Sequence, residues 1–502
     1  MVKRYAKRFF HSLWQPPAEK PPSFWAICKQ LNRTQWITFT AAFLGWTVDA
    51  FDYFCVSLAV PEIAADFDVM PSEVTSAITT TLMLRPVGAL IFGLLADKYG
   101  RRWPLMIDIL LFSIINMASG FAPNLEVFIA LRALFGIAMG GEWGLGASLA
   151  LETLPIEARG LFSGIYQQGY ATGYLLAALV NFAVTGTGSS WRILFWTGAV
   201  FALLAVFIRI FVPESQSFEK TQEARELSGR SYVKELMHML KNHYRRSIYM
   251  IILMAFFNFY AHGSQDLYPT FLRVQLGYTP TEQTATTVIH NIGAIIGGTL
   301  VGLYSNYLGR RISIVFSAIM VGAFIPLWIY GPNLHSLRFG AFALQFFVQG
   351  AWGIVPAHLN ELAPANFRGL MPGLSYQLGN LISAASSQIQ ATLGERYPLR
   401  NDDGSLQMRE GNPIPDYGYT QAIFMGVVVA CLIITTLVGK EERNKDFMQN
   451  IYEDEHGRVI GQDDIDAQKI EQGQQSEPPA AIVTAEEEAD SVVHASNTEK
   501  KS

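Results

Sequence analysis

A row of polar side chains interrupts an apolar segment of the chain at NFYAHGSQDLYPT, residues 258–270. On a helix, Asn258, His262, Gln265 and Asp266 would share one face, within an arc of about 100°. Four such groups facing lipid would be costly, so the pattern indicates a face that lines a cavity for substrate and protons. Two other interpretations stay open: polar packing between helices, and a helix end that enters the lipid headgroups.

Arg85 is the second candidate, in the apolar segment TTLMLRPVGALIFG. A guanidinium near mid-membrane needs a carboxylate or backbone carbonyls as partners. Its planar fork binds a carboxylate through two parallel hydrogen bonds, which a lysine does not reproduce. Arg85 is therefore either the anchor of a substrate carboxylate or half of a fixed ion pair with Asp49, Asp52 or Glu142. For Glu142 we favour an ion pair with Arg132.

Two more carboxylates, Asp49 and Asp52, lie three residues apart in GWTVDAFDYF and so share a helix face. A carboxylate in low-dielectric surroundings can carry a proton, and so can His262. We favour His262 and Asp266 as the pair that couples protons to substrate, with Asp49 and Asp52 as an alternative relay. The two aspartates could equally be structural partners of an intramembrane arginine such as Arg132.

The elements that must position these residues are membrane helices. Of the 502 residues, 50% are hydrophobic and only 16% are charged, whereas a soluble protein carries about 25% charged residues. A bilayer core needs about 20 apolar residues per helix. On that basis the sequence predicts twelve spans, near 36–60, 72–95, 103–121, 125–151, 160–184, 191–212, 247–272, 282–304, 312–331, 336–360, 370–392 and 419–438.

The two sets of six spans repeat each other. GLLADKYGRR begins at Gly93 and GLYSNYLGRR at Gly302, an offset of 209 residues. ETLPIEARG and ELAPANFRG have the same offset, and so do GEWG and GAWG. Because an even number of helices separates the copies, both halves enter the membrane with the same orientation. This predicts two related bundles with a site between them near the bilayer midplane.

Charge placement predicts the topology and the domain boundaries. Lys and Arg gather in the loops DKYGRRW, PIEARG, NYLGRR and PANFRG, which places both termini in the cytoplasm. Residues 441–502 hold 16 Asp and Glu against 6 Lys and Arg, and this composition predicts a disordered tail. The predicted parts are a cytoplasmic segment (1–35), a six-helix bundle (36–212), a cytoplasmic loop (213–246), a second bundle (247–438) and the tail (439–502).

The loop GLLADKYGRR resembles the signature of the major facilitator superfamily, although Asn306 replaces the aspartate in the second copy. RALFGIAMG resembles a pattern of its proton-coupled members, and PES at 213–215 resembles its sugar-porter branches. The resemblance implies twelve helices in two parallel six-helix repeats. It also implies inter-helix ion pairs that close an inner gate, formed by Asp97, Arg101, Glu152, Arg159, Arg310, Glu361 and Arg368. Alternatively, these charges are topology signals with weak, exposed pairs.

The stretch 258–270 resembles N-x-x-[S/T]-H-x-[S/T]-Q-D-x-x-x-T, the signature of fungal lactate/pyruvate permeases in the sialate:proton symporter-like branch. Ala261 departs from it. The resemblance implies import of a short monocarboxylate (lactate, pyruvate, acetate or propionate) with a proton across the plasma membrane, and it supports Arg85 as the carboxylate anchor. Gln168 and Asn380, in glycine-rich segments, are further candidates for hydrogen bonds to the substrate.

Other functions stay open as alternatives. They are a short dicarboxylate permease, a sialate-like acid symporter, and a nutrient receptor derived from a transporter. The sequence contains no nucleophile–base set, metal-ligand motif or phosphate-binding loop, so we expect no enzyme activity, cofactor, metal or nucleic-acid partner. The expected partners are the substrate and the bilayer, together with a ubiquitin ligase and endocytic adaptors at the lysine-bearing tail.

Overall fold

The computed structural model describes residues 22–69, 71–186, 190–228, 232–409, 411–445, 447, 452–453, 459–460 and 464–465. Eight continuous helical segments among them are long and apolar enough to cross a membrane. They comprise α4 (Pro71–Tyr99), α5 (Arg102–Ser119), α10 (Arg192–Arg209), α13 to η2 (Tyr244–Gln275), α15 (Pro280–Leu308), α16 (Arg310–Tyr330), α17 with α18 (Leu334–Trp352, Val355–Leu362) and α21 (Tyr417–Val438).

The other four predicted spans are also helical, but they carry buried charges or breaks. They are α3 (Arg33–Phe67), α6 with α7 (Leu125–Ala138, Glu142–Glu152), α8 with α9 (Arg159–Gln167, Gly169–Gly186) and α19 with α20 (Leu370–Ser383, Ser386–Arg396). The sequence predicted each of the last three as one continuous helix. The break after α6 contains Gly140, where an added Cβ would lie 2.2 Å from the carbonyl oxygen of Arg85. Glycine there lets two helix backbones approach closely.

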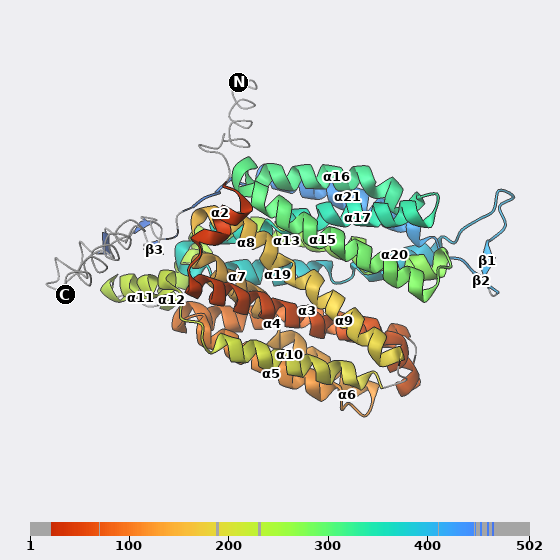
Figure 1. Ribbon diagram of the computed structural model, residues 1–502, viewed down its shortest axis with the longest axis horizontal. Helices are drawn as coiled ribbons and strands as arrows, with labels where there is room; N and C mark the ends of the chain where they lie inside the picture. The colour runs from red at the N-terminus through yellow and green to blue at the C-terminus, as the bar shows by residue number, and fades with distance from the viewer. Residues whose placement is uncertain are drawn as a thin grey trace, which may run out of the picture.

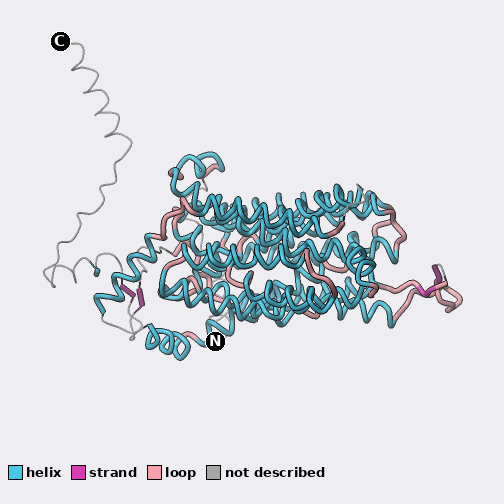
Figure 2. The backbone as a smooth tube through the Cα atoms, turned by 90° about the horizontal axis from the view of Figure 1, so that it is seen from below, coloured by secondary structure: helices cyan, strands magenta, loops and turns pink. Residues whose placement is uncertain are grey.

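Figure 1 shows the two halves side by side, with helices running along the long axis. Of the first half (α3 to α10), α3, α4, α5, α6, α9 and α10 lie below, and α15, α16, α17, α20 and α21 of the second half (α13 to α21) lie above. Figure 2 shows the same parallel packing from below. We call the end that carries residues 97–102, 152–160, 306–311 and 361–369 the signature end. The opposite end carries β1 (Met408–Arg409) and β2 (Asn412–Pro413), an antiparallel pair, and is the hairpin end.

The repeat of 209 residues is visible in the geometry of both halves. Asn124 caps α6 with φ −153° and ψ 170°, and Asn333 caps α17 with φ −153° and ψ 168°. A Cβ added at Gly88 would lie 1.8 Å from the carbonyl oxygen of Ile137, and the equivalent Gly297 would meet that of Phe346 at 1.9 Å. The same offset therefore relates both the helix caps and the close crossings.

The two halves meet through glycines at repeat-related positions. The backbone of Gly373 lies 2.5 Å from a Cβ added at Gly144, and that of Gly164 lies 3.1 Å from one added at Gly353. Adding 209 to 144 gives 353, and adding it to 164 gives 373, so the two contacts are equivalent. Side chains at these positions would push the halves apart.

Smaller elements cluster at the signature end. They are α2 (Phe24–Gln30), η1 (Ile156–Ala158), α11 (Gln216–Ser228), α12 (Tyr232–Asn242), η3 (Ala365–Phe367) and the strand pair β3 (Tyr452–Glu453) with β4 (Val459–Ile460). The prediction of a disordered segment from residue 439 onward does not hold at its start. Glu441 accepts backbone hydrogen bonds from α16, and Phe447 is buried. Most of the predicted tail beyond it lies outside the described residues.

Candidate functional site

A cavity of about 360 Å³, including the space at its mouth, lies between the two halves. It is lined by polar side chains from both halves and by a group of aromatic rings. The lining residues are Tyr53, Leu82, Arg85, Gln167 and Tyr170 from the first half, and Asn258, Ala261, His262, Gln349, Trp352, Tyr376 and Asn380 from the second. Four residues predicted from the sequence to bind substrate, Arg85, Asn258, His262 and Asn380, therefore line one space.

Arg85 contributes the cation of the first-half wall. Its Nη2 donates to Oδ2 of Asp49 at 3.2 Å, and both side chains are buried. Nε of Arg85 and Oδ1 of Asp49 are also buried, and neither has a hydrogen-bond partner among the described residues. Of the alternatives drawn from the sequence, the ion pair is formed, with Asp49, and the Arg85 side chain also lines the cavity.

Asp52 lies behind this pair and does not line the cavity. Its carboxylate is buried next to Gly198 of α10, where an added Cβ would meet Oδ1 at 1.9 Å. Arg132 donates to the amide oxygen of Asn116 at 2.8 Å and stacks on the ring of Phe135 at 3.7 Å. A relay through Asp52 would therefore have to pass within the first half, away from the cavity.

The expected ion pair between Glu142 and Arg132 is not formed. Glu142 instead pairs with Arg209 of α10 at 3.3 Å, with both side chains fully buried. The reason lies in the break between α6 and α7, because Glu142 begins a new helix and is not on the continuous turn assumed from the sequence. Arg209 also donates to the carbonyl of Ala41 at 3.1 Å, which connects α10, α7 and α3.

His262 lies in the cavity wall formed by the second half. It ends a chain of hydrogen bonds in which the donor and acceptor of each bond are fixed by the one before it. The Gly140 carbonyl accepts from Gln377 Nε2 at 3.3 Å, and Gln377 Oε1 accepts from Asn380 Nδ2 at 2.8 Å. Asn380 Oδ1 then faces His262 Nε2 at 3.3 Å, while Nδ1 faces Oδ2 of Asp266 at 3.1 Å. Since both ring nitrogens face oxygen acceptors, the arrangement suits a doubly protonated imidazolium.

Two predicted substrate ligands point elsewhere. Gln265 donates to Gln345 of α17 at 3.1 Å and does not line the cavity. Gln168 lies against α15, where a Cβ added at Gly298 would meet its Nε2 at 1.8 Å. The junction between α8 and α9 falls at Gln168, and this directs the neighbouring Gln167 toward the cavity instead.

The aromatic lining was missed by the sequence analysis. Tyr376 packs against Trp143 at 4.5 Å between ring centroids and meets Trp352 edge to face at 5.8 Å. Tyr53 and Tyr170 line the first-half wall. Tyr53 stands in the same GWTVDAFDYF stretch as the aspartates, so its position was a usable signal. Such rings offer apolar area to a short carbon chain and polar tips to its oxygen atoms.

Ion pairs hold each half together at the signature end. Arg101 pairs with Glu152 at 3.1 Å and with Asp97 at 3.7 Å. In the second half, Arg310 pairs with Glu361 through two hydrogen bonds, at 2.9 Å and 3.0 Å. Arg101 and Arg310 are equivalent by the repeat, and so are Glu152 and Glu361. These side chains are buried, unlike the weak, exposed pairs of the alternative interpretation.

Other contacts at this end join the halves to each other. Asp97 accepts from the backbone N–H groups of Gly369 and Leu370, both at 3.0 Å. Asn306 donates to the carbonyls of Ile156 and Glu157, at 3.1 Å and 2.8 Å. Further in, Ser163 donates to the Gly353 carbonyl at 2.7 Å and accepts from Ala357 N–H at 3.0 Å. The two halves are therefore in contact at the signature end, and the cavity is closed toward that end.

Comparison with known proteins gives the following matches. Residues 42–387 match the family Major Facilitator Superfamily. A carboxylic acid transporter protein homolog of Saccharomyces cerevisiae is 34% identical over 438 residues, which cover 83% of this chain and 70% of the relative. The sialic acid transporter NanX of Escherichia coli is 29% identical over 377 residues, covering 74% and 90%. The cis,cis-muconate transport protein of Acinetobacter baylyi is 28% identical over 368 residues, covering 72% and 88%.

Solved structures agree on the architecture. The proton:xylose symporter XylE bound to 6-bromo-6-deoxy-D-glucose gives a TM-score of 0.62 at 18% identity, covering 82% of this chain and 97% of that one. The partially occluded, inward-open form of XylE from E. coli gives a TM-score of 0.58, covering 83% and 100%. At this identity the likeness concerns the fold alone, and it confirms the predicted arrangement of two six-helix bundles.

Proposed function

The chain belongs to the Major Facilitator Superfamily, and we propose that it carries small carboxylic acids across the plasma membrane, with short monocarboxylates such as lactate and pyruvate as cargo and a proton as the coupling ion. It is a multi-pass membrane transporter and not an enzyme. The observation that carries the proposal is the Arg85 guanidinium, which lines the cavity between the halves with a buried Nε that has no partner among the described residues.

The lining of the cavity supports a small acid as cargo. A guanidinium holds a carboxylate by a charge-assisted, bidentate contact. Asn258 and Asn380 can hydrogen-bond a hydroxyl or keto oxygen, and the rings of Tyr376 and Trp352 can cover a short carbon chain. The similarity to a carboxylic acid transporter homolog of yeast supports the same cargo class.

Asp49 supplies a physical route from proton binding to substrate binding. Arg85 is shared between Asp49 and any carboxylate that enters the cavity, so the two anions compete for one cation. Protonation of Asp49 removes one competitor and frees Arg85 for the substrate. A proton and a substrate would then bind together, which is the thermodynamic requirement for symport.

His262 and Asp266 form the second proton site in this proposal. The side chain of Asp266 is 27% exposed, and that of His262 only 8%. Asp266 is therefore the more accessible member of the pair, and it can pass a proton between water and the buried imidazole. Loss of the His262 proton would remove a positive charge from the wall opposite Arg85 and weaken the hold on a bound anion.

The closed signature end corresponds to one state of an alternating-access cycle. Because Lys and Arg gather in the loops at this end, we assign it to the cytoplasm. The cavity then belongs to a state that is shut toward the cytoplasm, and import requires the contacts between Asp97 and α19 and between Asn306 and η1 to separate. The lysines at 469, 500 and 501, proposed as acceptors for a ubiquitin ligase, lie outside the described residues.

A dicarboxylic or sialate-like acid is the second candidate cargo. The observation that favours it is the imidazole of His262, a second group able to carry a positive charge, in the second-half lining of the cavity. Two cationic groups on facing walls suit an anion with a carboxylate at each end. A monocarboxylate would use Arg85 and leave His262 to its proton.

Uptake into cells that lack their own acid transporters tests the function. Radiolabelled lactate would be competed with pyruvate, acetate, propionate, succinate, malate and sialic acid, at several pH values. We expect monocarboxylates to compete, dicarboxylates to fail, and uptake to rise as the outside becomes more acidic. Arg85→Gln should abolish uptake at normal surface levels. Arg192→Lys, in the ion pair with Asp66 at the hairpin end, is the matched control. Competition by succinate alone would instead support the dicarboxylate alternative.

A further inference from the structure

The chain does not leave the bundle where α21 ends. Residues 441–445 and Phe447 fold back over the signature end, and we call them the return segment. Its first part is fixed to the second half. Glu441 accepts from the backbone N–H groups of Arg310 at 3.2 Å and Arg311 at 3.0 Å, and Arg443 donates to the Tyr307 carbonyl at 2.7 Å.

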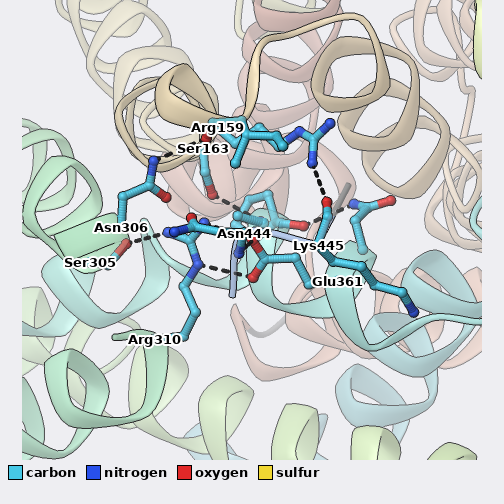
Figure 3. Close-up of polar contacts among 12 residues, drawn as sticks. Arg159, Ser163, Ser305, Asn306, Arg310, Glu361, Asn444 and Lys445 are labelled. Atoms are coloured by element: carbon cyan, nitrogen blue, oxygen red, sulfur yellow. Dashed lines mark hydrogen bonds and ion pairs between the residues drawn. The ribbon is translucent and has the colours of Figure 1, made fainter. Parts of the chain in front are cut away.

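The middle of the return segment reaches the buried ion pairs and then the first half. Asn444 N–H donates to Oε1 of Glu361 at 3.2 Å, the carboxylate that Arg310 also binds. One residue later, the Lys445 carbonyl accepts from Nη1 of Arg159 at 2.6 Å. Figure 3 shows Arg159 and Arg310 approaching Lys445 and Glu361, on either side of the backbone at Asn444. The segment thus crosses from one half to the other within two residues.

Phe447 completes the crossing. Its ring lies under the guanidinium of Arg159 at 3.7 Å and under that of Arg368 at 4.2 Å, and the residue is only 1% exposed. Arg159 and Arg368 differ by 209 in number, so they are the same residue in the two repeats. The ring therefore contacts two equivalent arginines, one from each half. An aromatic face attracts both cations, so one side chain of the return segment binds both halves.

A comparison within the molecule separates the anchor of the return segment from its crossing part. In the first half, Glu214 accepts from Arg102 N–H at 3.0 Å, and Ser215 donates to Glu152 at 2.6 Å. These contacts match those of Glu441 and Asn444, and they stay within one half. The contacts of Lys445 and Phe447 with Arg159 go further and join the two halves. They are not needed to finish a helix bundle, so they require another explanation.

We propose that Arg159 and Arg368 form an inter-half binding surface for the return segment, and that Phe447 bound there holds the signature end shut. The two arginines belong to halves that must separate at this end when the cavity opens toward it. Separation breaks at least one of the two ring contacts and the hydrogen bond to Lys445. The segment therefore stabilises the closed state and sets how often the signature end opens.

Thiol labelling of the full-length protein in lipid nanodiscs tests this without any substrate, so the outcome does not depend on the proposed cargo. The native cysteines Cys28, Cys55 and Cys431 are first replaced. Ala357→Cys then serves as the reporter. Ala357 is 1% exposed, and its N–H donates to Ser163 of the other half. A second reporter, Ala202→Cys, lies inside the first half, is 0% exposed and should not react unless that half unfolds.

Phe447 is changed to Ala, to Leu and to Tyr in this background. Loss of two buried cation–π contacts should raise the labelling rate of Ala357→Cys at least about fivefold in the Ala and Leu variants. The Tyr variant keeps the ring face and should stay within about twofold of the parent. Unchanged labelling in the Ala and Leu variants would overturn the proposal. So would an equal rise with Tyr, or a parallel rise at Ala202→Cys, which would mean unfolding.

Discussion

The two halves share one fold but differ in the charge they bury within the membrane. The first half buries Asp49, Asp52, Arg85, Asp108, Arg132 and Glu142, each at most 3% exposed. The offset of 209 places Asn258, Ala261, Ala294, Ser317, Ala341 and Ala351 at the equivalent positions of the second half. The same backbone therefore packs with or without charge at all six positions.

This difference shows that the fold does not require charged residues at these six positions. A buried ion is costly to desolvate, and an uncharged residue at the same position is often neutral or stabilising. The second half provides such residues at every one of these positions. We therefore infer that Arg85 and Asp49 serve substrate and proton binding. The other four charged residues would serve to position these two.

At the signature end, in contrast, the two halves carry equivalent ion pairs. Arg101 with Glu152 and Arg310 with Glu361 form equivalent buried pairs. Among the residues predicted to form the inner gate, only Asp97 has a different residue, Asn306, at the equivalent position of the other half. Asp97 accepts from N–H groups at the start of α19, and Asn306 donates to carbonyls at η1. A negative charge suits the N-terminus of a helix, whereas carbonyl oxygens require a donor. Each residue therefore fits only the backbone groups that it meets in the opposite half.

The largest expected effect comes from removing the charge at Arg85. Arg85→Gln leaves Asp49 as an unpaired buried carboxylate and deprives the substrate of its cation. Removing one partner of a buried, hydrogen-bonded charge pair across a binding contact costs about 2–5 kcal/mol, so substrate affinity should fall by at least about 30-fold. Arg85→Lys keeps the charge but loses the fork, and should lose about tenfold. Uptake kinetics at matched surface levels measure both, and a normal KM in either variant would contradict the anchor role.

Asp49→Asn should make this part of the first half resemble the second, where Asn258 occupies the equivalent position. The amide mimics a protonated carboxyl group. In the parent, uptake should rise as the outside pH falls, because protonation of Asp49 frees Arg85. In Asp49→Asn, exchange of labelled for unlabelled substrate should lose the part of its pH dependence that Asp49 supplies and keep the part that His262 supplies, and accumulation driven by a proton gradient should be weaker. A pH profile identical to the parent would exclude Asp49 as a coupling site.

Exchanging Asp97 and Asn306 tests the contrast at the signature end. Asp97→Asn loses charge-assisted hydrogen bonds to two N–H groups, and Asn306→Asp places a carboxylate against two carbonyls. A hydrogen bond to a charged group contributes about 1.5–3 kcal/mol, so each change should lower uptake about tenfold or more by destabilising the closed state. The double variant should not restore uptake, because each partner surface is unchanged. Recovery in the double variant would show that the two positions are interchangeable.

Much of this arrangement could be predicted from the sequence. The repeat, the twelve spans and the membership of Arg85, Asn258, His262 and Asn380 in one site follow from motif spacing and from the cost of burying polar groups. The position of Gln168 could not, because it depends on where α8 ends. The pairing of Glu142 depends likewise on a helix break. The return segment is polar and lacks apolar periodicity, and the burial of Phe447 depends on an arginine surface that only the two halves together form.

Truncations test how far the second half extends along the chain. A chain ending at Asn450 keeps the return segment, and one ending at Lys440 removes it together with Glu441, which accepts two N–H groups of α16. We expect the longer form to transport at the rate of the full chain. The shorter form should transport several-fold more slowly, because the closed state loses its contacts with Arg159. Equal rates for the two forms would show that transport does not depend on the return segment.

The smallest effect is expected at Asp52, and this prediction separates the two aspartates of α3. Asp52 is buried beside α10, does not line the cavity, and has Ala261 as its equivalent in the second half. Both of its carboxylate oxygens lack hydrogen-bond partners among the described residues, so a neutral amide should be accommodated at little cost. We expect Asp52→Asn to keep uptake close to that of the parent, because Asp52 does not line the cavity and the amide has nearly the same volume as the carboxyl group. Its pH profile should also match the parent, in contrast to that of Asp49→Asn. A loss of pH dependence at Asp52 would instead place the proton route inside the first half, between Asp52 and Arg132.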